Sequence, residues 1–408
     1  MNAQNHPVLV AGAGVAGLTA ALAFATRGFP VRVFEQAPRL ETVGAGLQLS
    51  PNATHILQRL GVLESLRQRV VRPEAVVLKS AASLKELARV PLGAAAEKRW
   101  HAPYLVAHRA DLQRSLLERV EAHPAIELAL DAKVSGVGTD GQGVSLSVTT
   151  GGETRQVPGW LLVGADGVWS TVRKAADFKT GSRFSGELAW RTTVPLTKTF
   201  GASFGALGAP DCVTAFLHAG FHMIAYPVSG GEALNLVAFT KGERIAEGWS
   251  GNADPEILAR ATRGTAPALG RLIAGAESWL AWPLHTVDQE PSWIARGRVA
   301  LIGDAAHAMT PFAAQGAAMA IEDADTLAHF AGASPATDPA AALAAWERSR
   351  KPRVAKVARR GALNHLAWHA AGPVALARDL FLKVRSPASL AADLDWLYGW
   401  RAPEDGKR

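Results

Sequence analysis

The chain has 408 residues, of which 48% are apolar and 19% charged, so it is a globular protein with room for two domains and not a disordered one. The net charge is +7, but the basic residues are dispersed, and we interpret the runs 348–353 and 356–360 as a solvated helix face. We therefore expect no nucleic-acid partner, although a positive field suits an anionic small molecule. No stretch approaches the roughly 20 apolar residues of a membrane helix, so we expect neither a membrane partner nor a signal peptide. The single cysteine, Cys212, excludes an intrachain disulfide and a cysteine-based metal cluster and agrees with a cytoplasmic location.

The first predicted elements alternate between strand and helix. Residues 8–11 and 31–35 indicate short buried strands on either side of a helix at 15–27, which is the β-α-β pattern of a parallel sheet. Apolar spacing then predicts helices at 52–70 and 109–121. Further strands are expected at 75–92, 126–137, 143–149, 160–164 and 298–302.

The texture changes between residues 181 and 284. Short runs of Val, Thr, Phe and Trp separated by Gly, Pro and Asn predict an antiparallel sheet, interrupted by a helix at 254–274. From Ala313 onward the chain is rich in Ala and mostly helical in pattern. The predicted fold class is therefore α/β, with a Rossmann-like parallel sheet and its helices, a second β-sheet domain and a helical C-terminal region.

A glycine motif, Gly12-Ala13-Gly14-Val15-Ala16-Gly17, joins the first strand to the first helix. The first glycine permits a tight turn, the second a close approach of a pyrophosphate, and the third close packing of helix on strand. The phosphates would meet free N–H groups at the positive end of the helix. Glu35 ends the second strand, where a carboxylate can accept the ribose hydroxyls of a dinucleotide. This motif predicts dinucleotide binding but does not distinguish NAD from FAD.

Two later blocks also follow short buried strands. They are the stretch from Gly164 to Arg173, which contains Asp166, and the stretch from Gly303 to Pro311, which contains Asp304 and continues to Gln315-Gly316. Ligands of open α/β sheets bind at the carboxyl ends of the strands, so both blocks are expected beside the dinucleotide.

With these blocks, the chain resembles the class A flavoprotein monooxygenases of the para-hydroxybenzoate hydroxylase fold, and within them the salicylate hydroxylase and 3-hydroxybenzoate 6-hydroxylase-like proteins. The stretches from Gly44 to Asn52 and from His108 to Leu112 add to the resemblance, which spans almost the first 325 residues. It implies that the dinucleotide is a tightly bound, non-covalent FAD. The resemblance implies FAD contacts from Gly12, Gly14, Val15, Ala16, Gly17, Glu35, Gln36, Arg39, Gly46, Arg109, Asp166, Asp304, Pro311, Gln315, Gly316 and Ala317.

The resemblance also implies individual roles within that set. Asp304 would bind the ribityl chain, Arg109 would lie along the ribityl and phosphate region, and Arg39 near the adenine. Asp166 would hold FAD and assist the nicotinamide cofactor; the alternative is that both aspartates only cap helices. Pro311 would shape one face of the flavin. Independently of the resemblance, Gly316 lies at the start of a predicted Ala-rich helix (317–330), whose positive end could face the flavin and stabilise the reduced form.

The resemblance implies an enzyme, an FAD-dependent monooxygenase (aromatic hydroxylase). NADH or NADPH would reduce the flavin transiently, since the sequence has no second glycine motif, and O2 would give a flavin C4a-hydroperoxide that hydroxylates a small phenolic or hydroxy-aromatic acid, salicylate-like, with or without loss of a carboxyl group. The alternatives are oxygenation of a larger polycyclic or N-heterocyclic compound and a non-enzymatic flavin sensor. The chain would act as a monomer or homodimer, and no metal-ligand spacing is present.

Four residues are candidates for the substrate side. His222 and Tyr226 are four apart in a probable strand and so face the same side. His222 could help to deprotonate a phenol and Tyr226 could hydrogen-bond the substrate; the alternative is core packing. Arg191 could pair with a substrate carboxylate or the flavin edge, or face solvent, and Gln48 could approach either ligand. Pro311 favours a salicylate-like reaction over 6-hydroxylation of 3-hydroxybenzoate.

Domain boundaries follow from these blocks. We expect a discontinuous FAD-binding domain (residues 1–72, 101–180 and 285–360), a substrate-binding β-sheet domain (73–100 and 181–284) and a C-terminal helical region (361–408). For His307 a structural role is as plausible as a chemical one. The aromatic residues of the tail, which include Trp368, Trp396, Tyr398 and Trp400, are expected to pack across the FAD domain or in a dimer interface.

Overall fold

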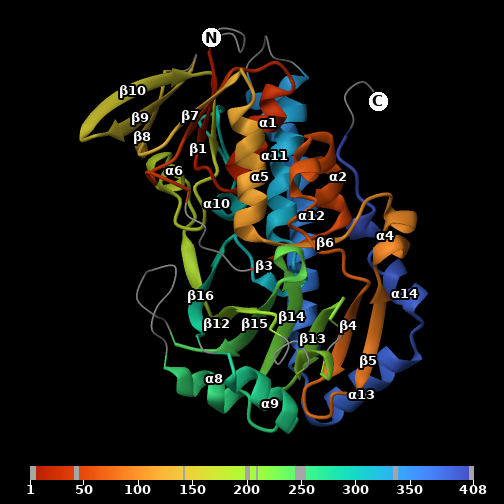
Figure 1. Cartoon of the computed structure of the whole chain (residues 1–408). Coiled ribbons are helices and arrows are strands. Elements are labelled where there is room, and N and C mark those ends of the chain that lie inside the picture. The colour runs from red at the N-terminus through yellow and green to blue at the C-terminus, as the bar shows by residue number, and fades with distance from the viewer. Residues whose placement is uncertain are drawn as a thin grey trace.

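The structure is a computed structural model, which describes residues 6–40, 46–140, 143–197, 203–207, 210–243, 254–276, 278–333 and 339–403. In this part of the chain the strands form sheets of six, seven, three and two strands. Figure 1 shows the six-stranded sheet and its helices in the upper half and the seven-stranded sheet below them. No helix in the described ranges is both long enough and apolar enough to cross a bilayer.

The six-stranded sheet carries the glycine motif. Its order is β17-β18-β11-β1-β2-β7, and every pair is parallel except β17 with β18. Both central strands are fully buried, which is usual where helices cover both faces of a parallel sheet. The strands are β1 (Val8–Ala11), β2 (Val31–Phe34), β7 (Ile126–Ala129), β11 (Leu161–Gly164), β17 (Ile294–Ala295) and β18 (Val299–Leu301). The predicted β-α-β start of a parallel sheet is thus confirmed.

Three helices pack together beside this sheet: α1 (Val15–Ala25), α5 (Arg109–Glu121) and α11 (Gly316–Gly332). Nearly all of α1 is buried, because it lies between α5 and α11 (Figure 1). The single helix expected at 52–70 is wrong: Gly61, with φ +71, separates two helices. The shorter helices of this half are α2 (Pro51–Arg59), α3 (Val62–Leu66), α4 (Gly93–Trp100), α6 (Thr171–Ala175) and α10 (Asp304–His307).

Two small antiparallel sheets complete the upper half. One pairs β3 (Gly46–Leu49) with β6 (Leu105–His108) and lies where the two halves meet (Figure 1). The other has the order β10-β9-β8 and projects to one side, with strands β8 (Lys133–Thr139), β9 (Val144–Thr150) and β10 (Glu153–Gly159). The expected strand at 126–137 is divided between β7 and β8, and the exposed strand β10 has no counterpart among the predicted elements.

The seven-stranded sheet forms the lower half in the order β16-β12-β15-β14-β13-β4-β5. It is not purely antiparallel as expected, because β13 and β4 are parallel. The expected helix at 254–274 is two helices, α8 (Pro255–Ala261) and α9 (Pro267–Ala274), which cover one face. The strands are β4 (Ala75–Ser80), β5 (Glu86–Pro91), β12 (Ser182–Pro195), β13 (Val213–Leu217), β14 (Phe221–Val228), β15 (Ala233–Lys241) and β16 (Leu280–Val287).

The C-terminal region joins the two halves. The long helix α12 (Ala340–Trp368) packs on α11, where Trp346 donates to Thr326, and its far end reaches β14, where the Trp368 ring meets His222. The remaining helices are α13 (Gly372–Val384), α14 (Pro387–Ala392) and α15 (Asp395–Tyr398). α12 therefore connects the parallel sheet to the larger sheet through side-chain contacts at both ends.

Candidate active site

The glycine motif and the two aspartate blocks of the sequence meet at one edge of the parallel sheet. Strands β18, β11, β1 and β2 are consecutive neighbours, so their carboxyl ends lie in a row. Asp304 follows β18, Asp166 follows β11, the glycine motif follows β1 and Glu35 follows β2. This is the edge at which open parallel sheets bind their ligands.

The glycine motif leaves open space at the start of α1. Gly12 has φ +98, and a Cβ there would lie 2.7 Å from the carbonyl oxygen of Ala165. A Cβ on Gly17 would lie 1.9 Å from the carbonyl oxygen of Gly12. Around Gly14, by contrast, a Cβ would meet no atom within 4 Å, and no side chain caps the helix. The N–H groups of the first turn, which include Val15 and Ala16, are thus available to a phosphate group.

Glu35 braces the glycine motif. Its Oε2 accepts a hydrogen bond of 2.8 Å from the N–H of Ala13, and its Oε1 accepts one of 3.0 Å from Ala37. Gln36 and Arg39 follow it and are exposed. A carboxylate oxygen has further lone pairs, so the expected contact of Glu35 with ribose hydroxyls remains compatible with these bonds.

Asp166 caps α6. Its carboxylate accepts hydrogen bonds from the Ser170 hydroxyl (2.5 Å) and from the N–H groups of Thr171 (2.7 Å) and Val172 (3.0 Å). Burial raises the pKa of Asp166, and these hydrogen bonds only partly oppose the shift. Asp166 therefore caps a helix, as the alternative interpretation predicted, but capping does not exclude a cofactor contact.

Asp304 is placed differently. It is the first residue of α10, it is exposed, and in the described part of the chain its carboxylate has no hydrogen-bond partner. Gly303, with φ +56, allows the strand to turn closely against Ala16 and Ala320. Arg109, the first residue of α5, is exposed in the same way. Exposed, unpaired groups of opposite charge at this edge suit a dinucleotide with phosphates and hydroxyls.

The start of α11 is held from inside the protein. Gln315 is buried, and its Nε2 donates to the Ser50 hydroxyl at 2.9 Å. The side chain expected near the flavin is thus turned inward, and only its backbone remains for a ligand. Gly316 is exposed and Ala317 half-buried at the first turn, around which a Cβ on Gly316 would meet nothing within 4 Å.

A buried charged network supports this loop. Glu322 accepts from Arg350 (2.7 Å) and Arg353 (2.6 Å), and Asp323 accepts from Arg350 (2.8 Å). His307 bonds Asp323 at 2.5 Å, so its role is structural. Burial alone would raise the pKa of Asp323, but His307, Arg350 and the hydrogen bonds outweigh it and lower the pKa to about 2. The expectation that residues 348–353 form a solvated face is wrong for Arg350 and Arg353, because both pair with acids of α11.

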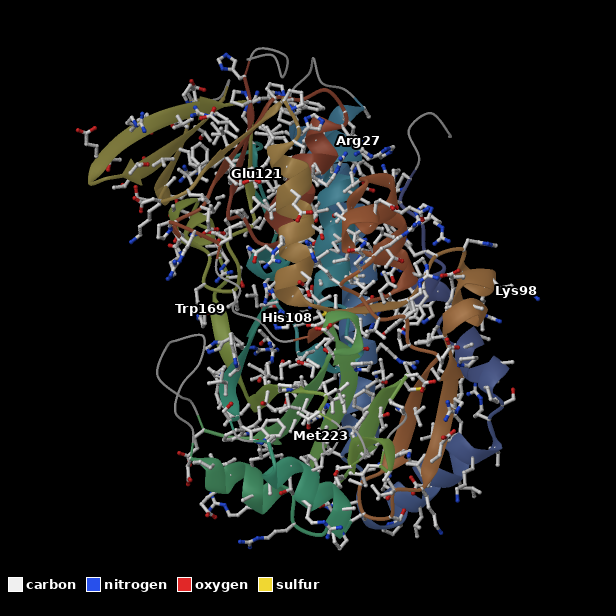
Figure 2. All side chains as sticks on the ribbon, in the orientation of Figure 1. Arg27, Lys98, His108, Glu121, Trp169 and Met223 are labelled. Carbon is white, nitrogen blue, oxygen red and sulfur yellow. The ribbon has the colours of Figure 1, made fainter. Side chains whose placement is uncertain are left out.

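The larger sheet presents the substrate-side candidates on one face. His222 and Tyr226 alternate with Met223 and Ala225, which point toward the α8–α9 side. Figure 2 places Met223 in the lower sheet and His108, the neighbour of Arg109, where the two halves meet. Arg191 is in register with Val237, and Val237 with Ile224, so Arg191 shares the face of His222 and Tyr226. This face looks toward the six-stranded half and α12.

His222 lies in an aromatic enclosure. Its ring stacks on Phe239 with centroids 4.6 Å apart and meets the edges of Phe312 at 5.3 Å and Trp368 at 4.9 Å. Its Nδ1 lies 3.1 Å from Nε2 of His369, whereas its own Nε2 is buried and has no partner in the described ranges. Burial, and then the neighbouring histidines, lower the pKa of His222 well below its usual value, so the ring is neutral near pH 7.

Tyr226 lies at the contact between the two halves. A Cβ on Gly46 would come 2.7 Å from Cε2 of Tyr226, and the Gly46 N–H donates to Asn235 at 2.8 Å. Gly46 therefore touches the larger sheet. Gln48, two residues on, accepts from the Tyr104 hydroxyl at 2.6 Å. Gly44 and Ala45, which contribute to the resemblance, lie outside the described residues.

Arg191 is a half-buried cation without an acidic partner in the described ranges. Its Nε is buried and unpartnered, and no ion pair of this side chain occurs in the described ranges. Its guanidinium carbon lies 5.3 Å from the centroid of the Trp282 ring. Burial, followed by the charge of Arg109, lowers the pKa of Arg191 to about 10, and Tyr226 opposes this shift. Such a site attracts an anion.

The loop after Asp304 is fastened to α12. Pro311 begins a short 3-10 turn, η2 (Pro311–Ala313), and Asn364 of α12 donates to the carbonyl oxygen of Phe312 at 2.9 Å. Gly361 faces the same loop, where a Cβ would make an ordinary contact of 3.6 Å with the Ala313 nitrogen. Pro311 is half-buried, and it lies next to the Phe312 ring that packs on His222.

Sequence reasoning missed the residues that α12 brings to His222. His365 and His369 are four apart, a spacing that places both on one helix face, but nothing in the sequence connects that face to β14. The aromatic residues of the tail pack within the chain. The Arg353 guanidinium lies over the Trp400 ring, 4.6 Å from its centroid, and Tyr398 meets Trp100 edge-on.

Comparison with known proteins agrees with this geometry. The protein-family model described as "FAD binding domain" matches residues 5–361. The 3-hydroxybenzoate 6-hydroxylase of Polaromonas naphthalenivorans (strain CJ2) is 35% identical over 407 residues, covering 98% of this chain and 97% of the relative.

Two solved structures are similar over most of their length. A salicylate hydroxylase substrate complex has a TM-score of 0.79 at 25% identity, covering 97% of this chain and 95% of the other. Klebsiella pneumoniae HpxO complexed with FAD and uric acid has a TM-score of 0.81 at 25% identity, with 96% of both chains covered. The fold, the edge occupied by Gly14, Asp166 and Asp304, and these similarities together establish that the chain belongs to the family of FAD-dependent aromatic monooxygenases.

Proposed function

We propose that this monooxygenase hydroxylates a small hydroxy-aromatic acid, salicylate-like, using NADH or NADPH and O2. The single observation that carries the substrate class is Arg191, a half-buried cation on the same sheet face as His222 and Tyr226, whose buried Nε has no partner and which has no acidic partner among the described residues. A carboxylate is the ligand that a guanidinium prefers, and a phenol is the group that an imidazole and a second phenol recognise. The similarity to a 3-hydroxybenzoate hydroxylase supports the same class.

The residues of the parallel-sheet edge are proposed to hold FAD. The first turn of α1 at Gly14 would bind the pyrophosphate, with Glu35, Gln36 and Arg39 toward the adenosine. Asp304 and Arg109 would bind the ribityl and phosphate region. Pro311 and the first turn of α11, at Gly316 and Ala317, would face the flavin ring. When bound, FAD takes electrons from NAD(P)H and activates O2, which supplies the oxygen atom of the product.

The residues of the larger sheet are proposed to bind and ionise the substrate. Arg191 would anchor the carboxylate, Tyr226 would hydrogen-bond the ring substituent, and Nε2 of His222 would accept the phenolic proton. Ionisation makes the ring more electron-rich and therefore more reactive toward an electrophilic oxygen. Phe239, Phe312 and Trp368 exclude water from this step.

We propose that each of the two larger sheets belongs to a separate domain, one for FAD and one for the substrate. Residues 1–72, 101–180 and 285–360 would form the FAD-binding domain, residues 73–100 and 181–284 the substrate domain, and residues 361–408 the cover between them. We propose that the enzyme is cytoplasmic, because NADH and NADPH are supplied there, and that it acts as a monomer or homodimer.

The turnover test is NAD(P)H oxidation with a panel of hydroxybenzoates, and each product is identified by mass. A product that gains one oxygen from one small acid is the expected result; no stimulation by any of them would overturn the substrate class.

Arg191 is tested by a change of charge on both partners. In Arg191→Gln the dissociation constant for the acid should rise by about 10- to 100-fold, because a hydrogen bond to a charged group contributes roughly 1.5–3 kcal/mol. The dissociation constant of the matching carboxamide should change little. If the variant keeps its preference for the acid and instead shifts the flavin potential, Arg191 contacts the flavin and not the carboxylate.

His222 is tested by His222→Gln, which should bind FAD normally and lose hydroxylation by about 100-fold or more, as expected for a lost general base. Unchanged turnover would mean that His222 only packs the core.

An N-heterocyclic substrate is the second candidate, favoured by the similarity to HpxO, whose structure contains uric acid. Hydroxynicotinates in the same panel separate the two, since only one class should give oxygenated product.

A further inference from the structure

A chain of histidines leads from β14 into α12. Nδ1 of His222 lies 3.1 Å from Nε2 of His369, and Nδ1 of His369 lies 3.1 Å from the carbonyl oxygen of His365. The His365 ring in turn bonds Glu187 of β12 through its Nε2, at 2.5 Å. Among the described residues no three such groups converge on a common metal position, so the arrangement is a line and not a cluster.

The hydrogen bonds of this line determine where each proton lies. A backbone carbonyl oxygen only accepts, so Nδ1 of His369 must carry a hydrogen. In a neutral imidazole the other nitrogen then has a lone pair, so Nε2 of His369 is an acceptor. Nδ1 of His222 must therefore donate, and Nε2 of His222 is left as a bare acceptor. That atom is the one that is buried without a partner.

Neutral rings are what this environment favours. Burial lowers the pKa of His369 to about 4, with the charge of His365 acting in the same direction, and burial likewise lowers that of His222. The groups that face His369 are His222 on β14, His365 on its own helix, Lys241 at the end of β15 and His218 before β14. Lys241 and His218 further disfavour a charged His369, and the hydrogen bond to the His365 carbonyl opposes them.

We infer that His369 is a positioning residue for the reaction: its Nε2 accepts a hydrogen bond from Nδ1 of His222 and so fixes His222 in the tautomer whose Nε2 is free to accept the phenolic proton. This inference rests on the proposed function, in which His222 is the base. The C-terminal region would thus take part in the reaction by orienting a side chain of β14, a strand of the larger sheet.

The proton movement balances without another reactant. The phenolic O–H bond breaks and an Nε2–H bond forms on His222. The phenol becomes phenolate and His222 becomes an imidazolium paired with it, while the Nδ1–H bond of His222 stays intact and donates to Nε2 of His369. His369 stays neutral, as its surroundings favour, and its Nδ1–H remains on the His365 carbonyl.

Histidine ¹⁵N spectra of the FAD-loaded enzyme test the tautomer. His222, identified by the signal missing in His222→Gln, should be protonated at Nδ1 only. His369→Leu should abolish that preference, whereas His369→Gln should restore most of it, because the amide oxygen can accept from Nδ1 near the place of the lost nitrogen. His218→Gln is the matched control and should leave the tautomer unchanged. A His222 protonated at Nε2 in the native enzyme, or unaffected by His369→Leu, overturns the inference.

A bound phenol that changes absorbance on ionisation tests the proton uptake. In the native enzyme its apparent pKa should fall on binding, and in His369→Leu it should rise back, with kcat lower by about 10- to 100-fold and KM little changed. His369→Gln should recover kcat together with the tautomer preference, since its amide oxygen accepts the same hydrogen bond. If His222→Gln abolishes ionisation and His369→Leu does not, the inference fails and the proposed function stands; if neither does, His222 is not the base.

Discussion

Asp166 and Asp304 follow neighbouring strands, yet their carboxylates have opposite surroundings. Asp166 is half-buried and accepts three hydrogen bonds at the start of α6, so its removal would damage the protein itself. Asp304 is exposed and has no partner in the described part of the chain. A polar group that the fold does not use is the better reporter of ligand binding.

We therefore predict that Asp304→Ala purifies with much less FAD than the native protein but with an unchanged melting temperature of the FAD-free form. The reason is that the substitution removes a ligand contact and no internal hydrogen bond. The measurement is flavin absorbance per polypeptide, followed by titration with FAD. Asp166→Ala is the comparison and should lower the melting temperature as well. Full FAD occupancy in Asp304→Ala would contradict its assigned role.

Buried charged side chains contribute to the contact between helices α11 and α12. Glu322, Asp323 and Arg350 are buried side by side, although an Ala-rich helix with scattered charges resembles a solvated face. Periodicity predicted α5 at its observed bounds, because its apolar stripe and its ends coincide. It missed the break at Gly61, since apolar spacing continues across it.

Only part of the candidate site could be predicted from the sequence. The glycine motif and the two aspartate blocks were predictable because each is local and follows a strand. The i, i+4 spacing put His222 and Tyr226 on one face, which the register confirms. The partners of His222 were out of reach, because His369 comes from an element 147 residues further along the chain.

We predict that Glu322→Gln lowers the free energy of unfolding by about 3–5 kcal/mol, because it leaves Arg350 and Arg353 buried without a full counter-charge. Urea denaturation of the FAD-free protein measures the loss. Glu127→Gln is the matched control: Glu127 pairs with Arg32 at 2.8 Å on the surface, and its loss should cost less than about 1 kcal/mol. Equal effects of the two substitutions would argue against a buried network.

At the scale of the whole molecule, the C-terminal region links the two halves through His222 and His369, whose surroundings favour neutral rings. The folded-state pKa values of His222 and His369 are depressed, with that of His369 at about 4, whereas an unfolded histidine titrates near 6.5. The unfolded chain thus binds more protons below pH 6.5, and the stabilisation present above that pH is lost as pH falls toward about 4.

We accordingly predict that the free energy of unfolding declines between about pH 6.5 and 4 and that His369→Leu makes this decline shallower. Chemical denaturation at a series of pH values measures it. The Asp323 pKa of about 2 places its own contribution at lower pH, so the two effects separate. A decline that is the same in the variant would mean that other groups titrate in this window.

The halves meet at Gly46, and this contact allows cofactor binding to be separated from substrate binding. Gly46→Ala should place a methyl group 2.7 Å from the Tyr226 ring and displace it, lowering kcat/KM while FAD occupancy is retained. Gly14→Ala should do the reverse: its Cβ meets no protein atom within 4 Å and its φ of −75° suits alanine, so stability is kept, but the methyl group occupies the space proposed for the pyrophosphate. Flavin content and steady-state kinetics of both variants test the pair. If Gly46→Ala also loses FAD, the β3 strand belongs to the cofactor site more than to the junction, and the division between the two sheets would have to be redrawn there.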